Sequence, residues 1–222
     1  PLFCSYNKAN ESHFHYIFSS ELKMMTHMIT DSLYKAEQFT PGSYMEINMN
    51  SGKQITKQYF NSVCSEITSH HTHEYFHECI RNALISAVNK RVNNTDREVA
   101  CLLSGGLDSS LITALVARTL PNAANLKTFS IGMEGSEDVR YAKMVADHIG
   151  SHHNEVYFTA EDGVNALEEV IYATETWDTT TVRASVGQFM VCKHIGTKTD
   201  CKVVLVGEGP DEVCSSYLFN WY

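Results

Sequence analysis

The sequence has 222 residues, of which 43% are hydrophobic, 12 are glycine and 4 are proline. This length and composition predict a globular chain with a buried core, and they exclude collagen-like, low-complexity and disordered proteins. No apolar run approaches the ~18 residues of a membrane-spanning helix, and the first residues lack the basic and apolar regions of a secretion signal. We therefore expect a soluble cytoplasmic protein without a membrane partner.

The net charge of −9 arises entirely in the second part of the chain. Residues 1–95 contain 8 basic and 8 acidic side chains, whereas residues 96–222 contain 9 basic and 18 acidic ones. This asymmetry predicts two unlike segments, and it argues against a nucleic-acid partner because phosphate backbones bind broad basic surfaces. An acidic segment is compatible with a ligand that brings its own magnesium, since the metal offsets repulsion between carboxylates and phosphates.

The beginning of the chain is predicted to form a small antiparallel sheet. Residues 13–18 and 44–49 have the aromatic and polar mixture of strands, and Asn50-Ser51-Gly52 forms a turn into the stretch 53–60. A short helix is expected at 21–26, between the strands. This arrangement does not resemble a complete domain.

A helical pattern starts at about His73 and ends near Asn93, because apolar residues recur there every three or four positions. The boundary between the two segments is expected between Asn61 and His73. The stripe that this helix would bury consists of Phe76, Ile80, Ala83, Leu84, Ala87 and Val88.

Strands and helices alternate along the rest of the chain. Such alternation predicts an α/β fold in which crossover helices cover both faces of a doubly wound parallel sheet. The predicted strands are 99–103, 126–131, 153–158 and 202–206, and the predicted helices are 109–120, 137–149, 161–174 and 183–194.

The strongest functional signal lies at the turn between the first of these strands and its helix. The strand leads into Ser104-Gly105-Gly106, and the helix begins at Asp108-Ser109-Ser110. Glycines let a backbone approach a phosphate closely, and the free amides of a helix start attract anions. No Lys-Ser/Thr pair follows, which excludes a Walker A loop, and Asp108 would meet a phosphate only across a divalent cation. An ordinary turn with helix-capping serines is the alternative without function.

A second signal follows the last predicted strand. There Gly207-Glu208-Gly209-Pro210-Asp211-Glu212 places three carboxylates on a glycine-rich loop. Ligands of open parallel sheets collect beyond the carboxyl ends of the strands. We therefore expect this loop to face the Ser104 loop and to share a magnesium ion with it, the alternative being an exposed acidic turn.

The string from Ser104 to Ser110 resembles the pyrophosphate-binding loop of the ATP pyrophosphatases. Together with the Glu208 loop, it is similar to the glutamine-hydrolysing asparagine synthetases. Further strings agree with this family, including 19–23, 41–44, 128–133 and 175–185.

The resemblance implies a domain for each segment. Residues 1–62 would be the C-terminal end of a class II glutamine amidotransferase domain, a remnant of an antiparallel α+β fold. Residues 63–222 would be the N-terminal part of the ATP-dependent synthetase domain, with an adenine nucleotide alpha hydrolase-like fold.

For the activity, the resemblance implies an ATP-dependent amide ligase of asparagine biosynthesis. ATP and aspartate form β-aspartyl-AMP and release pyrophosphate, and ammonia from glutamine then gives asparagine and AMP. The implied ligands are thus ATP, aspartate, glutamine or ammonia, and Mg²⁺, and a homodimer is one assembly that the resemblance allows.

The resemblance also implies roles for individual residues. Asp108 and Asp211 would bind Mg²⁺, and Glu208 would take a proton from the incoming ammonium or amine. Thr180 and Arg183 would stabilise charge around the α-phosphate and carboxylate, although an arginine after three threonines also fits a helix cap or a structural ion pair. The implied ATP-binding residues are Leu103, Ser104, Gly105, Gly106, Asp108, Ser109, Ser110, Ile131, Val206 and Gly207.

The sequence departs from the family pattern in the second loop and at its ends. Val206 and Pro210 stand where the family usually has serines, so a hydroxyl that would contact phosphate is missing and the loop is stiffer. The family's N-terminal cysteine nucleophile and a distal lysine facing the phosphates lie outside the sequence, so we expect a middle section of a longer enzyme. A β-lactam-forming synthetase and a catalytically inactive relic are the alternative functions.

Overall fold

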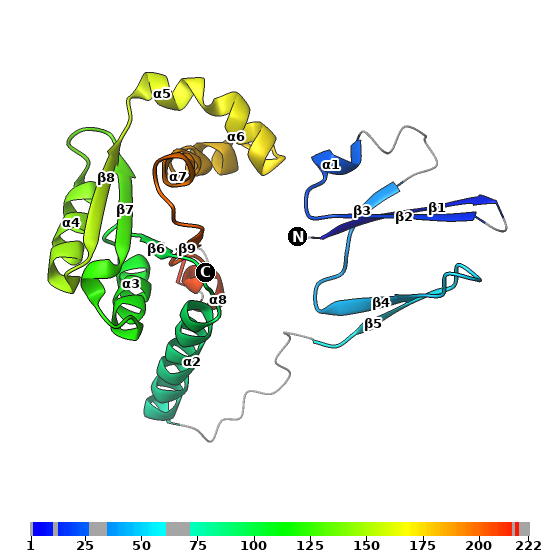
Figure 1. Cartoon of the computed structure of the whole chain (residues 1–222), viewed down its shortest axis with the longest axis horizontal. Helices are drawn as coiled ribbons and strands as arrows, with labels where there is room; N and C mark the ends of the chain where they lie inside the picture. The colour runs from blue at the N-terminus through cyan, green and yellow to red at the C-terminus, as the bar shows by residue number, and fades with distance from the viewer. Residues whose placement is uncertain (1, 11–12, 27–34, 61–71, 215, 218–222) are drawn as a thin grey trace. The chain divides into compact units, whose positions relative to one another are not determined.

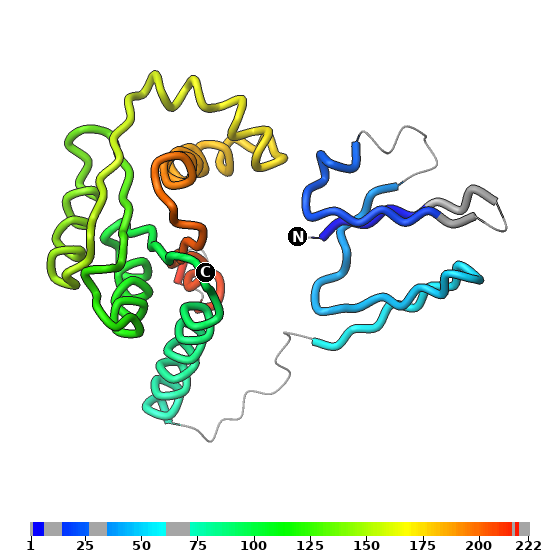
Figure 2. Tube along the Cα trace, viewed as in Figure 1, coloured from blue at the N-terminus to red at the C-terminus, as the bar shows by residue number. Residues whose placement is uncertain are grey.

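The computed structural model divides into two compact units, Pro1–His70 and His71–Tyr222 (Figure 1). Figure 2 shows the path of the chain through each of them. Among the residues described, no helix is long and apolar enough to cross a membrane. The described residues are 2–10, 13–26, 35–60, 72–214 and 216–217.

The first unit consists of two antiparallel sheets, in agreement with the predicted antiparallel structure. Strands β1 (Phe3–Asn10), β2 (His13–Ser19) and β3 (Lys35–Gln38) form one sheet in the order β2-β1-β3. Strands β4 (Ser43–Ile47) and β5 (Gln54–Gln58) form the other sheet.

Two strands and the length of a helix differ from the sequence expectation in this unit. The pattern did not indicate β1 or β3, whose polar residues have low strand propensity; pairing of β1 with a neighbour on each side overrides that propensity. The expected helix at 21–26 is shortened to α1 (Lys23–Thr26).

The second unit contains a four-stranded parallel sheet. Its strands are β6 (Val99–Leu102), β7 (Lys127–Gly132), β8 (His152–Tyr157) and β9 (Val203–Leu205), in the order β8-β7-β6-β9. The crossovers place helices on both faces, so the predicted α/β fold is confirmed (Figure 1). The helices are α2 (His73–Asn93), α3 (Leu107–Thr119), α4 (Glu137–Ile149), α5 (Ala160–Asn165), α6 (Leu167–Thr174), α7 (Thr179–Lys198) and α8 (Pro210–Cys214).

Alternate side chains of the strands supply the two faces of the core. On one face, Cys101 of β6 packs with Val116 of α3 and Val92 of α2. On the other face, Phe129 of β7 packs with Val191 and Ile195 of α7. This alternation follows from the two-residue period of a strand. It also sets the direction in which each loop leaves the end of its strand.

The expected apolar stripe of α2 is buried only toward its C-terminal end, which corrects the sequence prediction. Val88 and Val92 are buried, whereas Phe76 and Ile80 are 44% and 52% exposed. The helix packs on α3. Helical periodicity identified the element correctly, but the extent of burial depends on what the helix packs against.

Two other helices have boundaries that the sequence did not predict. The stretch expected as one helix at 161–174 is divided into α5 and α6 at Ala166. Helix α7 begins four residues earlier than expected, because Asp178 is its N-cap and accepts a hydrogen bond from the Thr181 amide at 2.8 Å.

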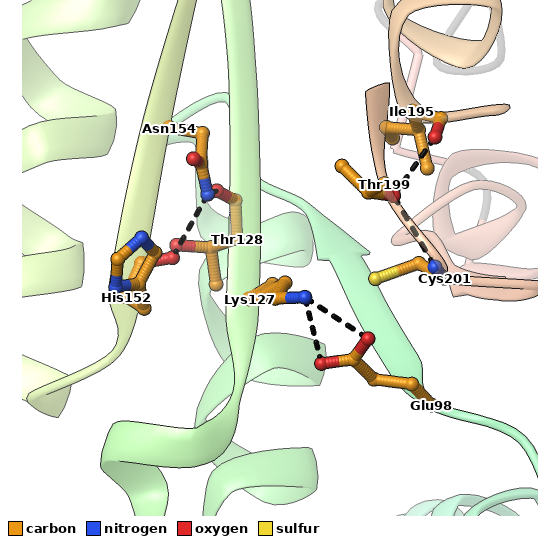
Figure 3. Close-up of polar contacts among 8 residues, drawn as sticks. All are labelled: Glu98, Lys127, Thr128, His152, Asn154, Ile195, Thr199 and Cys201. Atoms are coloured by element: carbon orange, nitrogen blue, oxygen red, sulfur yellow. Dashed lines mark hydrogen bonds and ion pairs between the residues drawn. The ribbon is translucent and has the colours of Figure 1, made fainter. Parts of the chain in front are cut away.

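The amino ends of the strands are joined by polar contacts (Figure 3). Lys127, at the start of β7, contacts both carboxylate oxygens of Glu98 at 2.9 and 3.0 Å. This hydrogen bond lowers the pKa of the Glu98 carboxyl. Thr199 Oγ1 accepts from the Cys201 amide at 3.2 Å, just before β9. These contacts occupy the edge of the sheet opposite the carboxyl ends of the strands.

His153 forms the centre of a polar network within the sheet. Its Nδ1 lies 2.9 Å from Thr128 Oγ1 and its Nε2 lies 3.1 Å from Ser130 Oγ, and both hydroxyls belong to β7. A neutral imidazole satisfies such a pair of hydroxyls by donating through one nitrogen and accepting through the other. Burial lowers the pKa of His153, because desolvation disfavours the charged ring.

This lowered pKa predicts a loss of stability in mild acid. The unfolded chain takes up a proton at this histidine as the pH falls through about 6.5, while the folded ring stays neutral to lower pH. The free energy of unfolding should therefore decrease as the pH falls below that value. Urea denaturation at pH 7.5 and 5.5 should show a smaller decrease for His153→Gln than for the wild type. The matched control is His152→Gln, because the His152 side chain is exposed. Equal pH dependence in all three proteins would contradict the prediction.

Candidate active site

The carboxyl ends of β6, β7 and β9 border one cavity of about 300 Å³. Both loops that the sequence singled out contribute to it, together with the first turn of α4 and the middle of α7. The structure therefore brings the two loops together as expected. The cavity is lined by Leu102, Leu103, Ser104, Gly106, Asp108, Ser109, Phe129, Ser130, Ile131, Asp138, Gln188, Val191, Val206, Gly207, Glu208 and Asp211.

Strand pairing and one glycine produce this juxtaposition. Strands β6 and β9 are parallel neighbours, with Cys101 opposite Leu205, so their carboxyl ends lie side by side. A Cβ atom on Gly207 would lie 2.5 Å from the Ser109 nitrogen and 2.7 Å from the Asp108 carbonyl carbon. The backbone after β9 thus packs directly on the first turn of α3, at a position where only glycine fits.

The loop after β6 is held in shape by its own serines. The Ser104 and Ser109 hydroxyls lie 2.9 Å apart, and Ser109 Oγ accepts from the Ser104 amide at 3.2 Å. Ser104 Oγ accepts from the Gly106 amide at 3.3 Å. Gly106 is the N-cap of α3 and provides no side-chain cap, so the first amides of this helix keep their attraction for an anion.

Two residues of the predicted phosphate loop do not line the cavity. Gly105 has φ of +84°, and a Cβ atom there would lie 2.6 Å from backbone atoms of Tyr141 and Ala142. Gly105 therefore serves the close packing of the loop on α4. Ser110 also lies outside the cavity, and its buried hydroxyl has no hydrogen-bond partner among the described residues.

Four carboxylates give the cavity an acidic character. Asp108 and Asp211, the predicted magnesium ligands, both line it, and so do Asp138 and Glu208. Glu208 Oε1 accepts a hydrogen bond from Gln188 Nε2 at 2.9 Å, and Asp211 accepts one from Ser216. The described lining contains no lysine or arginine. Such a site binds a phosphate compound favourably when a divalent cation accompanies it.

Apolar side chains form the remaining wall. Leu103 is 1% exposed, and its amide donates to the Phe129 carbonyl at 2.8 Å, which joins the ends of β6 and β7. Ile131 and Val191 border the same space. An apolar wall beside helix-start amides suits a ligand with an aromatic base and a phosphate chain.

Thr180 and Arg183 lie in the first turns of α7, where both are exposed and neither lines the cavity. The cap of this helix is Asp178, so Arg183 does not serve as its N-cap. The predicted residues that do line the cavity are Leu103, Ser104, Gly106, Asp108, Ser109, Ile131, Val206, Gly207, Glu208 and Asp211.

Sequence reasoning missed three polar residues of the cavity, Ser130, Asp138 and Gln188. Asp138 follows the carboxyl end of β7 by six residues, so the rule that ligands collect at strand ends offered a signal for it. Gln188 lies in the middle of α7 and had no local signal. Only the packing of α7 against the sheet identifies Gln188 as a site residue.

Several known proteins are similar to this chain in sequence. Residues 79–221 match the family described as Asparagine synthase. The human protein named asparagine synthetase [glutamine-hydrolyzing] is 40% identical over 217 residues, which cover 89% of this chain and 38% of that relative. The relative of the same name from Cricetulus griseus is 51% identical over 137 residues, covering 60% and 24%. The chain thus spans well under half the length of these curated relatives.

Among solved structures, the chain is similar to an NH3-dependent NAD synthetase from Campylobacter jejuni. The TM-score is 0.44 at 16% sequence identity, and the match covers 63% of this chain and 60% of that one.

Gly105 and Gly135 both have positive φ, but we expect their replacement by alanine to lower the free energy of unfolding by different amounts. Gly105→Ala combines left-handed strain with a clash against α4, whereas Gly135, with φ of +81°, has open space around its Cβ position. We expect Gly135→Ala to cost about 1 kcal/mol of unfolding free energy and Gly105→Ala about 3 kcal/mol or more, because overpacking adds to the strain. Chemical denaturation measures both, and equal costs would contradict the packing of Gly105 on α4.

Proposed function

The chain belongs to the asparagine synthase family, and from this membership we propose that it carries the nucleotide site of an ATP-dependent ligase that makes asparagine from aspartate and ammonia. The observation that supports the proposal most directly is the single cavity bordered by both the Ser104 loop and the Glu208 loop. The ammonia would come from glutamine hydrolysed in the full-length protein.

ATP is proposed to lie along the cavity with its base against the apolar wall and its phosphates at the start of α3. Leu103 and Ile131 would contact the adenosine, and the loop from Ser104 to Ser109 would present backbone amides to the pyrophosphate. Gly207 supports this placement, because it allows the β9 loop to border the same phosphate position.

The acidic lining fits a magnesium ion that arrives with the nucleotide. Asp108 and Asp211 would hold it, although the described residues contain no group of three or more His, Cys, Asp or Glu able to bind a metal unaided. Phosphate oxygens would complete the coordination, as is usual for Mg²⁺. The metal would neutralise charge on the phosphates during displacement of pyrophosphate.

The proposed reaction has two steps. First, a carboxylate oxygen of aspartate attacks the α-phosphorus of ATP, and the bond to the bridging oxygen of the leaving pyrophosphate breaks. Ammonia then attacks the acyl carbon of β-aspartyl-AMP, AMP leaves, and asparagine is released. Glu208 would accept a proton from the incoming ammonium, consistent with its place at the cavity. Thr180 and Arg183 would contribute where the substrate extends to the start of α7.

The two departures from the family pattern have different consequences for this proposal. Pro210 is the first residue of α8, a position where the fixed φ of proline suits a helix. The replacement at 210 is therefore accommodated by the fold. Val206 lines the cavity with no hydroxyl to offer, so contacts of this loop with phosphate would come from the backbone.

Aspartate-dependent exchange of labelled pyrophosphate into ATP by the full-length protein tests the first step. Asp108→Ala should reduce this exchange at least about 100-fold, because loss of a metal ligand removes several kcal/mol of charge stabilisation in the transition state. The matched control is Asp147→Ala on α4, whose carboxylate pairs with Lys143 outside the cavity. Exchange by Asp108→Ala at the rate of the control would contradict the metal assignment, and no exchange by the wild type would contradict the ligase function.

A further inference from the structure

We infer that Gln188 is a positioning residue that holds the carboxylate of Glu208 for proton transfer in the ammonia-dependent step. This inference rests on the proposed function and adds a residue to it. Gln188 and Glu208 both line the cavity, and Gln188 Nε2 donates to Glu208 Oε1 at 2.9 Å.

The donor of this hydrogen bond is on a rigid element. Gln188 lies in the middle of α7, a 20-residue helix that packs on both α6 and β7. One and two turns further on, Val191 and Ile195 are each only 2% exposed, which anchors this side of the helix in the core. Gln188 is itself exposed, and its side chain therefore projects into the cavity from a fixed backbone.

The acceptor, in contrast, is an exposed side chain on a short loop. Glu208 follows β9 and is flanked by Gly207 and Gly209, the latter with φ of +102°. Among the described residues, Gln188 provides the side-chain hydrogen bond to Glu208. Without it, the carboxylate would sample several rotamers in a cavity that already contains Asp108 and Asp211.

The chemistry of an amide suits the proposed task. An ionised carboxylate only accepts hydrogen bonds, so the NH₂ end of Gln188 must face Glu208. A lysine or arginine there would form an ion pair and favour the charged carboxylate, which opposes uptake of a proton. A neutral amide orients one carboxylate oxygen and leaves the other free to receive the proton.

Two half-reactions measured on the full-length protein separate positioning from general damage. Gln188→Leu should leave aspartate-dependent pyrophosphate exchange and the KM for ATP within about twofold of the wild type. It should lower kcat for asparagine formation from ammonium chloride about 10- to 100-fold, since a displaced catalytic group costs up to about 100-fold. Gln188→Glu, which keeps the length but places two carboxylates together, should lower this kcat at least as far.

A double-mutant comparison tests whether Gln188 acts through Glu208. Glu208→Gln should lose the ammonia-dependent step, and adding Gln188→Leu should lower the rate no further. The control variant is Lys193→Gln on the same helix, which removes an ion pair with Glu169 away from the cavity and should leave both half-reactions unchanged.

The outcomes distinguish this inference from the proposed function. An unchanged ammonia-dependent kcat in Gln188→Leu, equal losses in both half-reactions, or multiplied losses in the double variant would overturn the positioning role while the ligase function stood. Absence of aspartate-dependent exchange in the wild type would overturn the ligase function and the positioning role with it.

Discussion

The parallel pairing of β6 with β9 is the constraint on which the site depends. Residues 99–101 and 203–205 are 104 positions apart in the sequence, yet they pair residue by residue in the sheet. Parallel neighbours have their carboxyl ends at the same edge, so the two loops that follow them must meet. The absence of a side chain at Gly207 then allows backbone contact with the first turn of α3.

This arrangement separates two sources of charge within one cavity. Positive potential comes from the helix-start amides of α3. The charged side chains of the described lining, Asp108, Asp138, Glu208 and Asp211, are all acidic. A phosphate chain alone would meet mutual repulsion with these carboxylates. A metal-bound phosphate chain would satisfy both the amides and the acids, which is why the geometry supports a magnesium nucleotide as the proposed ligand.

Helix α7 contributes both to this cavity and to the core on one face of the sheet. Its apolar residues Val191 and Ile195 fill the core beside β7, while Gln188 reaches Glu208 on the loop after β9. A loop with glycines on both sides of its acidic residue gains order from such an external contact. The family resemblance indicated the two loops, whereas only the packing of α7 identifies the Gln188 amide as part of the site.

The sequence by itself determined the classes of structure in this protein. Alternation predicted the parallel sheet with helices on both faces, α4 spans the predicted range 137–149, and the strings at Ser104 and Glu208 indicated the loops that line the cavity. These features are local, because periodicity, capping and loop chemistry involve residues close together in the chain.

Only the tertiary structure decided the rest: that Gly105 faces α4, that Thr180 and Arg183 lie outside the cavity lining, that the first turns of α2 remain exposed, and that Gln188 reaches Glu208. Each of these depends on which distant surface an element packs against, and that choice is made by the whole core rather than by neighbouring residues.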